Sequence, residues 1–192
     1  ADAMETAECW QAAIHSTKAP STLVLTRQNL RAVRTDYVAE NLSAKGAYEL
    51  AGADGEAKIT IFASGSEVEI ALDARDMLQK DGMPTRVVSV PCFELFEQQD
   101  KAYREKVLGT APVKIAVEAA LRMGWDRFVG SDGAFVGMTG FGASAPAEEL
   151  YKYFGITAEA VAKLAGERVR NGVPKGEDAR AIPDNEPARP HP

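Results

Sequence analysis

Three short runs of apolar, mostly β-branched residues separated by helical patterns constrain the fold of this chain most strongly. The runs are AKITIFA at residues 57–63, PTRVVSV at residues 84–90 and VKIAVEA at residues 113–119, with FVGM at residues 135–138 as a fourth candidate. Near-continuous apolar strands that alternate with helices are typical of parallel sheets buried on both faces. The pattern therefore predicts an α/β fold: a mainly parallel twisted sheet with helices on both faces and right-handed crossovers.

The segments around these runs carry helical spacing. Residues 66–80 have a wide apolar stripe, followed by a glycine and a proline that suit a helix end. Residues 98–108 predict a second, more exposed helix. After a glycine-rich stretch, Pro146 and Gly155 suit the two ends of a further helix, and Thr157 suits the N-cap of the last one.

The residues before this unit have a different character. A helical pattern spans residues 4–17, with one apolar face made by Met4, Ala7, Trp10 and Ile14. TLVLT at residues 22–26 has the composition of a buried strand. Because one helix and one strand cannot cover each other without a sheet to join, we expect residues 1–35 to be a helix-strand remnant of another α/β domain whose larger part is absent.

The other boundaries follow from composition. Residues 36–56 contain several glycines and no sustained period, so we expect a linker there. Residues 57–168 form the predicted main domain, which is long enough for one core. Residues 169–192 hold five of the ten prolines and no aromatic residue, and we expect them to be a disordered tail.

Charge and cysteine usage exclude several classes of protein. With 28 acidic and 22 basic side chains the formal charge is −6, and such a field repels nucleic-acid phosphates and anionic membranes. There is neither a run of about 18 apolar residues nor a signal-peptide pattern at the first residues, so we predict a cytoplasmic protein without a nucleic-acid or membrane partner. Cys9, Cys92, His15 and His191 lack the spacing of a disulfide framework or a zinc site, and no metal site is predicted in this chain.

One candidate site lies where the first strand meets its helix. Ser64, Gly65 and Ser66 join the two elements, and the free N–H groups and dipole of a helix N-terminus can hold a phosphate or carboxylate. Serine followed three residues later by Glu67 or Glu69 also fits a capping box, which satisfies those donors internally. The sequence favours the cap and leaves the anion site open.

Other polar residues also have structural explanations. Glu118 ends the third strand, at the sheet edge where sites in open parallel sheets collect, but an acid without a visible partner could equally cap a turn or join an interface. We interpret His15 as a partly exposed structural residue. No nucleotide-binding glycine motif occurs in residues 130–142, and Ser144 has no suitably placed histidine for a serine hydrolase.

Arg27 is the most informative residue. It directly follows TLVLT, which would place a guanidinium at the carboxyl end of a strand, where its planar fork can bind phosphate through two hydrogen bonds. Arg31 and Arg34 could widen a positive patch, or could be solvated or paired with acids such as Asp36.

These segments resemble transketolase. LVLTRQNL at residues 23–30 is similar to the end of that family's pyrimidine-binding domain. Four further segments are similar to its C-terminal domain in order and spacing: GAYEL (46–50), FASGSEVEIALDA (62–74), TRVVSVPCFELFEQQDKAYREKVL (85–108) and GAFVGMTGFGASAPAEELYKYFGIT (133–157). The resemblance covers about residues 1–168.

The resemblance implies a thiamine diphosphate and Mg²⁺ enzyme, a homodimer that moves a two-carbon ketol unit from a ketose phosphate to an aldose phosphate in the pentose phosphate pathway and the Calvin cycle. It also implies that Arg27 binds the substrate phosphate. The family's cofactor motif, its activating glutamate and its thiazolium histidines do not occur in this sequence. We therefore expect no catalytic residue in this chain and no cofactor bound by this chain alone.

Two alternatives stay open. The parent enzyme could be another thiamine-dependent transferase, such as deoxyxylulose phosphate synthase or dihydroxyacetone synthase. The chain could also act alone as a non-catalytic assembly or ligand-binding module, which the complete unit at residues 57–168 permits. An in-frame Gly-Asp-Gly motif upstream of Ala1 supports the transketolase, whereas a start codon at or near Ala1 supports the module.

Overall fold

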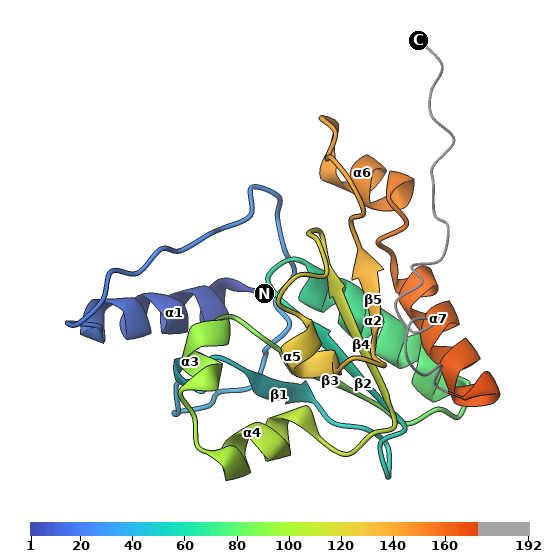
Figure 1. Cartoon of the computed structure of the whole chain (residues 1–192). Coiled ribbons are helices and arrows are strands. Elements are labelled where there is room, and N and C mark those ends of the chain that lie inside the picture. The colour runs from blue at the N-terminus through green and yellow to red at the C-terminus, as the bar shows by residue number, and fades with distance from the viewer. Residues whose placement is uncertain (173–192) are drawn as a thin grey trace.

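A five-stranded twisted sheet forms the centre of the computed structural model, which describes residues 1–172 (Figure 1). Its strands are β1 (Tyr48–Ala51), β2 (Ile59–Ala63), β3 (Thr85–Ser89), β4 (Val113–Glu118) and β5 (Ala134–Gly137). They lie in the order β1-β3-β2-β4-β5. Only β1 runs antiparallel to its neighbour, so the predicted mainly parallel sheet is confirmed.

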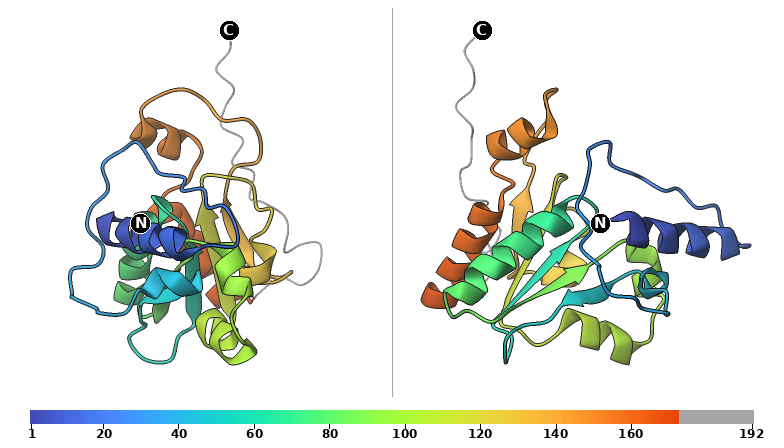
Figure 2. Two further views of the ribbon diagram at one scale, coloured as in Figure 1. Left: turned by 90° about the vertical axis from the view of Figure 1, so that its left-hand side faces the viewer. Right: turned by 180° about the vertical axis from the view of Figure 1, so that it is seen from behind.

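Helices cover both faces of the sheet, which confirms the predicted fold class (Figures 1 and 2). One face carries α2 (Glu67–Lys80) and α7 (Ala158–Asn171), which pack side by side. The other face carries α3 (Phe93–Glu97), α4 (Lys101–Leu108) and the short α5 (Asp126–Val129). The helix α6 (Ala147–Tyr153) stands beyond the carboxyl ends of the strands.

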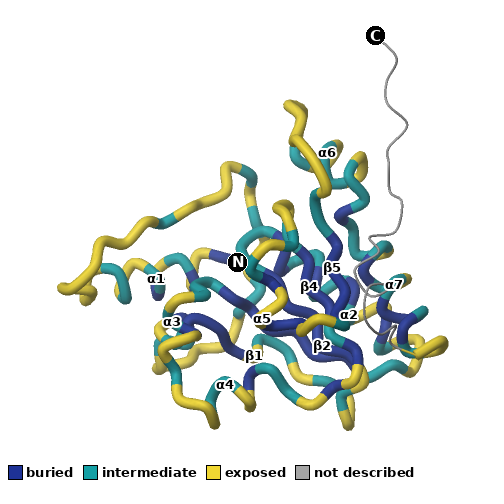
Figure 3. Tube along the Cα trace, viewed as in Figure 1, coloured by how far each residue is buried: buried dark blue, intermediate teal, exposed yellow. Residues whose placement is uncertain are grey.

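The two cores follow from the alternation of side chains along each strand. In β2, Ile59, Ile61 and Ala63 belong to the core under α2 and α7, whereas Phe62 points into the opposite core. Every residue of β2 and β3 is buried, as expected for inner strands covered by helices on both faces. Figure 3 shows the burial concentrated along the central strands.

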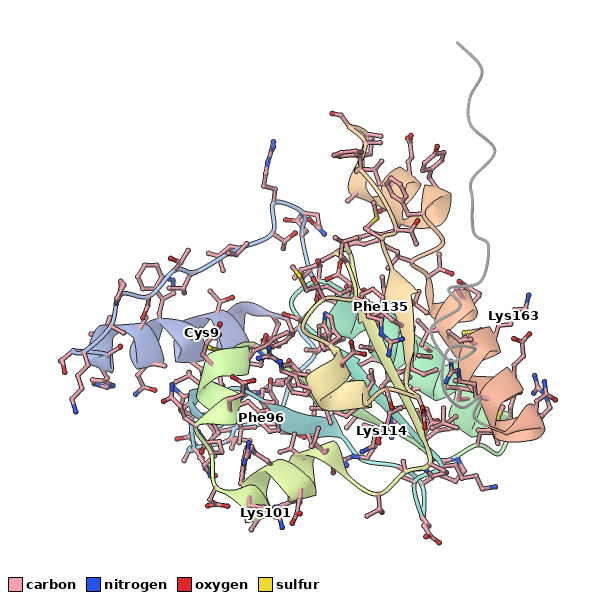
Figure 4. All side chains as sticks on the ribbon, viewed as in Figure 1. Cys9, Phe96, Lys101, Lys114, Phe135 and Lys163 are labelled. Atoms are coloured by element: carbon pink, nitrogen blue, oxygen red, sulfur yellow. The ribbon has the colours of Figure 1, made fainter. Side chains whose placement is uncertain are left out.

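The second core is aromatic. Phe128 is 1% exposed, and its ring lies 5.0 Å from the rings of both Phe93 and Phe96. Phe96 on α3 and Phe135 on β5, both labelled in Figure 4, belong to this cluster. Lys101 is exposed on α4 on this face, whereas Lys163 is exposed on α7 over the other core. Offset and tilted ring pairs of this kind add to the free energy gained by burial alone.

The N-terminal residues fold only partly as the sequence predicts. The expected helix is present as α1 (Ala3–His15), but its buried residues are Glu5 and Glu8. The apolar face points to solvent instead, with Trp10 51% exposed and Ile14 72% exposed. The reversal follows from the polar partners of Glu5 and Glu8, which draw the polar face of α1 inward.

The strand predicted at residues 22–26 is wrong for this structure. These residues have no regular secondary structure, and Val24 is 92% exposed. A strand needs the hydrogen bonds of a neighbouring strand, and this segment pairs with neither edge of the sheet. Apolar, β-branched composition without a pairing partner therefore leaves an extended segment.

The predicted linker at residues 36–56 also contains regular structure. A short 3-10 helix, η1 (Leu42–Lys45), is followed by β1, whose Tyr48 pairs with Ser89 of β3. The linker prediction is wrong for these residues, because a four-residue antiparallel edge strand carries too short a pattern to recognise. The other domain boundaries stay predictions, and residues 173–192 of the expected tail lie outside the described residues, whereas residues 169–171 belong to α7.

The remaining helix ends agree closely with the sequence. Thr157 caps α7, and its hydroxyl oxygen accepts from the N–H of Ala160 at 3.3 Å. Pro146 is the N-cap of α6 rather than its first helical residue. The short helices α3 and α5 were not predicted.

Candidate functional site

The order of the strands creates a meeting point at the carboxyl ends of β2 and β4. The chain leaves β2 for β3 on one side and later returns to β4 on the other side. In open α/β sheets, ligands bind at such a topological switch point. A cavity of about 590 Å³ opens here, lined by the turn after β2, the end of β4, α6 and residues of the segment 24–30.

Glu67 is a buried carboxylic acid that lines this cavity. It begins α2 and is only 3% exposed. The hydroxyl of Tyr151 donates to its Oε1 at 2.5 Å, and the hydroxyl of Ser66 donates to the same carboxylate at 3.2 and 3.3 Å. The N-terminus of α2 therefore holds a carboxylate supplied by its own first residue, which the helix dipole favours.

The predicted capping boxes at this turn are wrong. Ser66 makes no capping hydrogen bond, because its backbone is already helical, with φ −63° and ψ −27°, and its hydroxyl turns to Glu67. At Ser64 the backbone carbonyl, rather than the hydroxyl, accepts from the N–H of Glu67 at 3.2 Å. Ser64, Gly65 and Ser66 do line the cavity, and their role as an anion site stays a prediction.

Two carboxyl groups share the cavity. Burial, and to a lesser degree the charge of Glu67, raises the pKa of Glu118 to about 8. Burial also raises the pKa of Glu67, against the hydrogen bonds from Tyr151 and Ser66 that lower it. Glu118 Oε2 is buried and has no hydrogen-bond partner within residues 1–172. Glu118 therefore keeps its proton at neutral pH, and Glu67 is the neighbouring acid whose charge acts on its pKa.

Tyr151 is the residue that sequence reasoning missed. Burial, followed by its hydrogen bond to Glu67, raises the pKa of its phenol to about 12, so it stays a donor throughout the physiological range. Its hydroxyl also accepts from Gln28 Nε2 at 3.4 Å. No signal in the sequence marks this tyrosine, because its partners lie on segments distant along the chain.

Arg27 lies on the irregular segment beside the cavity rather than at the end of a strand. Its neighbours Thr26 and Gln28 both line the cavity. Arg27 itself is exposed, and within the described residues it makes no ion pair or hydrogen bond. Its guanidinium is therefore available to a ligand.

The wider positive patch does not form. Arg31 pairs with Asp73 of α2 at 2.6 Å, and Arg34 pairs with Glu8 of α1 at 2.6 Å. Both arginines are thus neutralised by acids, though not by Asp36, the acid named from the sequence. Of the three arginines Arg27, Arg31 and Arg34, it is Arg27 that has no acidic partner among residues 1–172.

Other features of the described chain point to no second site. His15 is exposed, rather than partly exposed, in the last turn of α1, and its structural role stays a prediction. Cys9 and Cys92 are free thiols. Across residues 1–172, no three or more His, Cys, Asp or Glu side chains gather in a way that could hold a metal ion. In the same range, no helix has the length and apolar character needed to cross a membrane.

Comparison with known proteins places this chain in a family. The model of the transketolase-like TK C-terminal domain matches residues 46–157, which run from just before β1 through α6. A curated transketolase from Cereibacter sphaeroides is 56% identical over 169 residues, which are 88% of this chain and 25% of that protein.

Solved structures agree with the sequence comparison. A transketolase from Leishmania mexicana superposes with a TM-score of 0.80 at 39% identity, covering 92% of this chain and 25% of that one. A Pichia stipitis transketolase in complex with sedoheptulose 7-phosphate superposes with a TM-score of 0.78 at 37% identity, covering 89% of this chain and 24% of that one. The chain thus spans about a quarter of the length of the relatives it matches, and it belongs to the transketolase family.

Proposed function

We propose that this chain supplies the C-terminal domain and the substrate-phosphate arginine of a transketolase. The complete enzyme would use thiamine diphosphate to transfer a two-carbon ketol unit from a ketose phosphate to an aldose phosphate. The observation that carries this proposal is Arg27, an exposed guanidinium without an acidic partner within residues 1–172, between two residues that line the cavity. The sedoheptulose 7-phosphate bound by a relative supports sugar phosphates as the ligand class.

The described residues do not fit the cofactor. Mg²⁺ prefers about six oxygen ligands in octahedral geometry, with carboxylates in their charged form. The cavity offers two carboxyl groups, and the pKa of Glu118, raised by burial to about 8, keeps that group protonated at neutral pH. We therefore place the cofactor and the reacting atoms outside this chain and derive no step through them.

The role of this chain in the reaction is to anchor the substrate. The guanidinium of Arg27 would donate two parallel hydrogen bonds to the phosphate, at the end of the sugar remote from the reacting carbon. Binding energy from such a remote group orients the reacting end of the substrate. The family resemblance further supports a cytoplasmic homodimer as the working form.

Replacement of Arg27 in the complete enzyme tests the proposal. Arg27→Ala should weaken use of phosphorylated donors by about 10- to 150-fold, mostly as a higher KM, because a charge-assisted hydrogen bond is lost. Hydroxypyruvate, a donor without phosphate, should be affected far less. Arg27→Lys should recover only part of the loss, because an ammonium lacks the planar fork.

A matched control removes a cation elsewhere. Lys163 is exposed on α7, on the opposite side of the molecule from α1 (Figure 4), so Lys163→Ala should leave both kinds of donor unaffected. An equal loss for phosphorylated and non-phosphorylated donors in Arg27→Ala would remove Arg27 from the substrate site.

The cofactor placement has a separate test. Calorimetric titration of the 192-residue chain with thiamine diphosphate and Mg²⁺ should give no binding at micromolar concentrations. Micromolar binding would favour the alternative in which this chain acts alone as a ligand-binding module.

A further inference from the structure

The segment that carries Arg27 has no regular structure of its own. Residues 22–32 form neither helix nor strand. A segment without a ladder of backbone hydrogen bonds is held in place by its side-chain contacts, and otherwise moves on the nanosecond to microsecond timescale. The contacts that flank Arg27 therefore determine where its guanidinium lies.

The first contact runs from the sheet domain to Gln28. Glu67, buried at the start of α2, accepts the single hydroxyl hydrogen of Tyr151 at 2.5 Å. With that hydrogen committed, the oxygen of Tyr151 is free to accept from Gln28 Nε2, at 3.4 Å. Ser66 Oγ lies 3.0 Å from the same oxygen and completes the cluster.

The second contact lies on the other side of Arg27 along the chain. Arg31 Nη2 donates to Asp73 Oδ1 at 2.6 Å and to the backbone carbonyl of Glu69 at 3.4 Å. Both partners belong to α2, the helix that begins with Glu67. Because α2 is packed against the sheet through buried residues, it offers a firm support, which holds the segment directly at Arg31 and, through Tyr151 of α6, at Gln28.

The two contacts differ in strength. The side chains of Arg31 and Asp73 are 45% and 47% exposed, and exposed ion pairs of this kind contribute little. The Glu67–Tyr151–Gln28 chain is partly or fully buried at each step, where hydrogen bonds are screened less by water. The contact through Tyr151 is thus the more buried of the two, and it ends at Gln28, the residue directly after Arg27.

We infer that Tyr151 is a positioning residue, through which the C-terminal α/β domain holds Arg27 at the place where the substrate phosphate binds. The inference rests on the proposed function of Arg27. It also gives the C-terminal domain a task in substrate recognition, although the domain contributes no reacting group.

The positioning can be measured on the 192-residue chain itself, without substrate or cofactor. Tyr151→Phe removes one hydroxyl and keeps the ring. In this variant the ¹⁵N order parameters of residues 26–28 should fall from about 0.85, typical of a rigid backbone, to below about 0.6. The matched control is Tyr153→Phe on the same helix, because Tyr153 is 42% exposed and its ring packs edge-on against Phe154.

The consequence for substrate is measured in the complete enzyme. Tyr151→Phe should raise KM for phosphorylated donors by roughly 3- to 10-fold, the effect of losing one ordinary hydrogen bond, with hydroxypyruvate affected much less. Tyr153→Phe should change neither donor. In the Arg27→Ala background, Tyr151→Phe should cause no further loss, because two residues that act through one contact are not additive.

The outcomes separate the two proposals. In one outcome, Arg27→Ala impairs phosphorylated donors more than hydroxypyruvate, while Tyr151→Phe gives the same order parameters and KM as Tyr153→Phe. Arg27 then keeps its role, and the positioning by Tyr151 is overturned. If Arg27→Ala does not discriminate, the phosphate assignment falls, and the order parameters alone decide whether Tyr151 orders the segment. Additive losses in the double variant would also overturn the inference, because Tyr151 would then act independently of Arg27.

Discussion

Glu8 and Arg34 form a buried, bidentate ion pair that holds α1 against the rest of the chain. Arg34 Nη1 donates to Glu8 Oε2 at 2.7 Å, and Nη2 donates to Oε1 at 2.6 Å. The N–H and hydroxyl of Ser43 donate to the same carboxylate at 3.1 and 2.7 Å. One turn earlier, Glu5 accepts from the hydroxyls of Tyr48 and Ser89 on the sheet, at 2.9 and 2.5 Å. The contact of α1 with the sheet domain is therefore polar, which is why its apolar face points outward.

Glu8→Gln should loosen α1 while leaving the sheet intact. Removal of one charge from a buried pair leaves the other uncompensated, at a cost of about 3 to 5 kcal/mol. This cost lowers the free energy that holds α1 against the rest of the chain, rather than the stability of the sheet. Hydrogen exchange followed by mass spectrometry should show α1 amides exchanging at least about tenfold faster, with β2–β4 unchanged. Glu40→Gln, at an exposed pair with Lys45, is the control and should change neither.

The same pair makes α1 sensitive to acid. Burial works to raise the pKa of Glu8, but the hydrogen bonds from Arg34 and Ser43 outweigh it and lower the pKa to about 2. A carboxyl with a depressed pKa stabilises the attached state above its ordinary pKa, and this stabilisation is lost as the pH falls through about 4.5 to 2. Fluorescence of Trp10 in a Trp125→Phe background should report the detachment. No acid transition of Trp10 in this range would contradict the prediction.

Glu118→Gln should stabilise the domain at alkaline pH. Because burial raises the pKa of Glu118 to about 8, the folded state binds a proton that the unfolded state loses, and stability falls as the pH rises from about 4.5 to 8. The amide stays neutral, so the variant should gain about 1 to 3 kcal/mol over the parent chain at pH 9 and little at pH 5. Urea unfolding at the two pH values measures this. A constant difference between the two proteins would show that Glu118 does not titrate in this way.

Gly46→Ala should destabilise the chain far more than Gly55→Ala. Both glycines have positive φ, +81° and +100°, so both variants carry backbone strain of about 1 to 2 kcal/mol. At Gly46 the added Cβ would also lie 2.2 Å from the backbone nitrogen of Phe96 and 2.3 Å from the carbonyl oxygen of Cys92, whereas at Gly55 nothing lies within 4 Å. Thermal unfolding should separate the two, and equal shifts in Tm would show that η1 can move away from α3.

Deletion of residues 1–35 should leave a folded and more soluble protein. The buried residues of both cores lie beyond residue 46, and the deleted part carries exposed apolar side chains, among them Trp10, Ile14, Val24 and Leu25. Exposed apolar patches favour association. Circular dichroism should show a cooperative melting transition, and light scattering should show less aggregation. Loss of the transition would mean that α1 belongs to the folding unit.

The central sheet could be predicted because its signals are local. Each of β2, β3 and β4 contains at least two consecutive apolar residues, and the helix after β2 ends close to a glycine and a proline. Residues 22–26 carry the same signal but lack a partner strand, and strand formation depends on that partner as much as on composition. Composition cannot show whether a neighbouring strand is within reach.

The site was harder to predict than the fold. Glu118 could be placed from strand order alone, since the carboxyl end of a parallel strand is a position that the sequence specifies. Glu67 matched a capping motif, and its actual partner, Tyr151, lies 84 residues away along the chain. Arg27 could be singled out because a guanidinium binds phosphate well and because the family resemblance points to this position. Its role in phosphate binding stays a prediction.

The lengths of the strands bear on how this domain meets other chains. Both edge strands, β1 and β5, have four residues, whereas the inner strands have five or six. In β1, a register shift between Glu49 and Ala51 interrupts even this short edge. A long, regular edge with free N–H and C=O groups is what an incoming strand needs as a template. This sheet offers such a template at neither end, so the domain should assemble with its partners through side-chain contacts of its helices and loops rather than by extending its sheet across a subunit boundary.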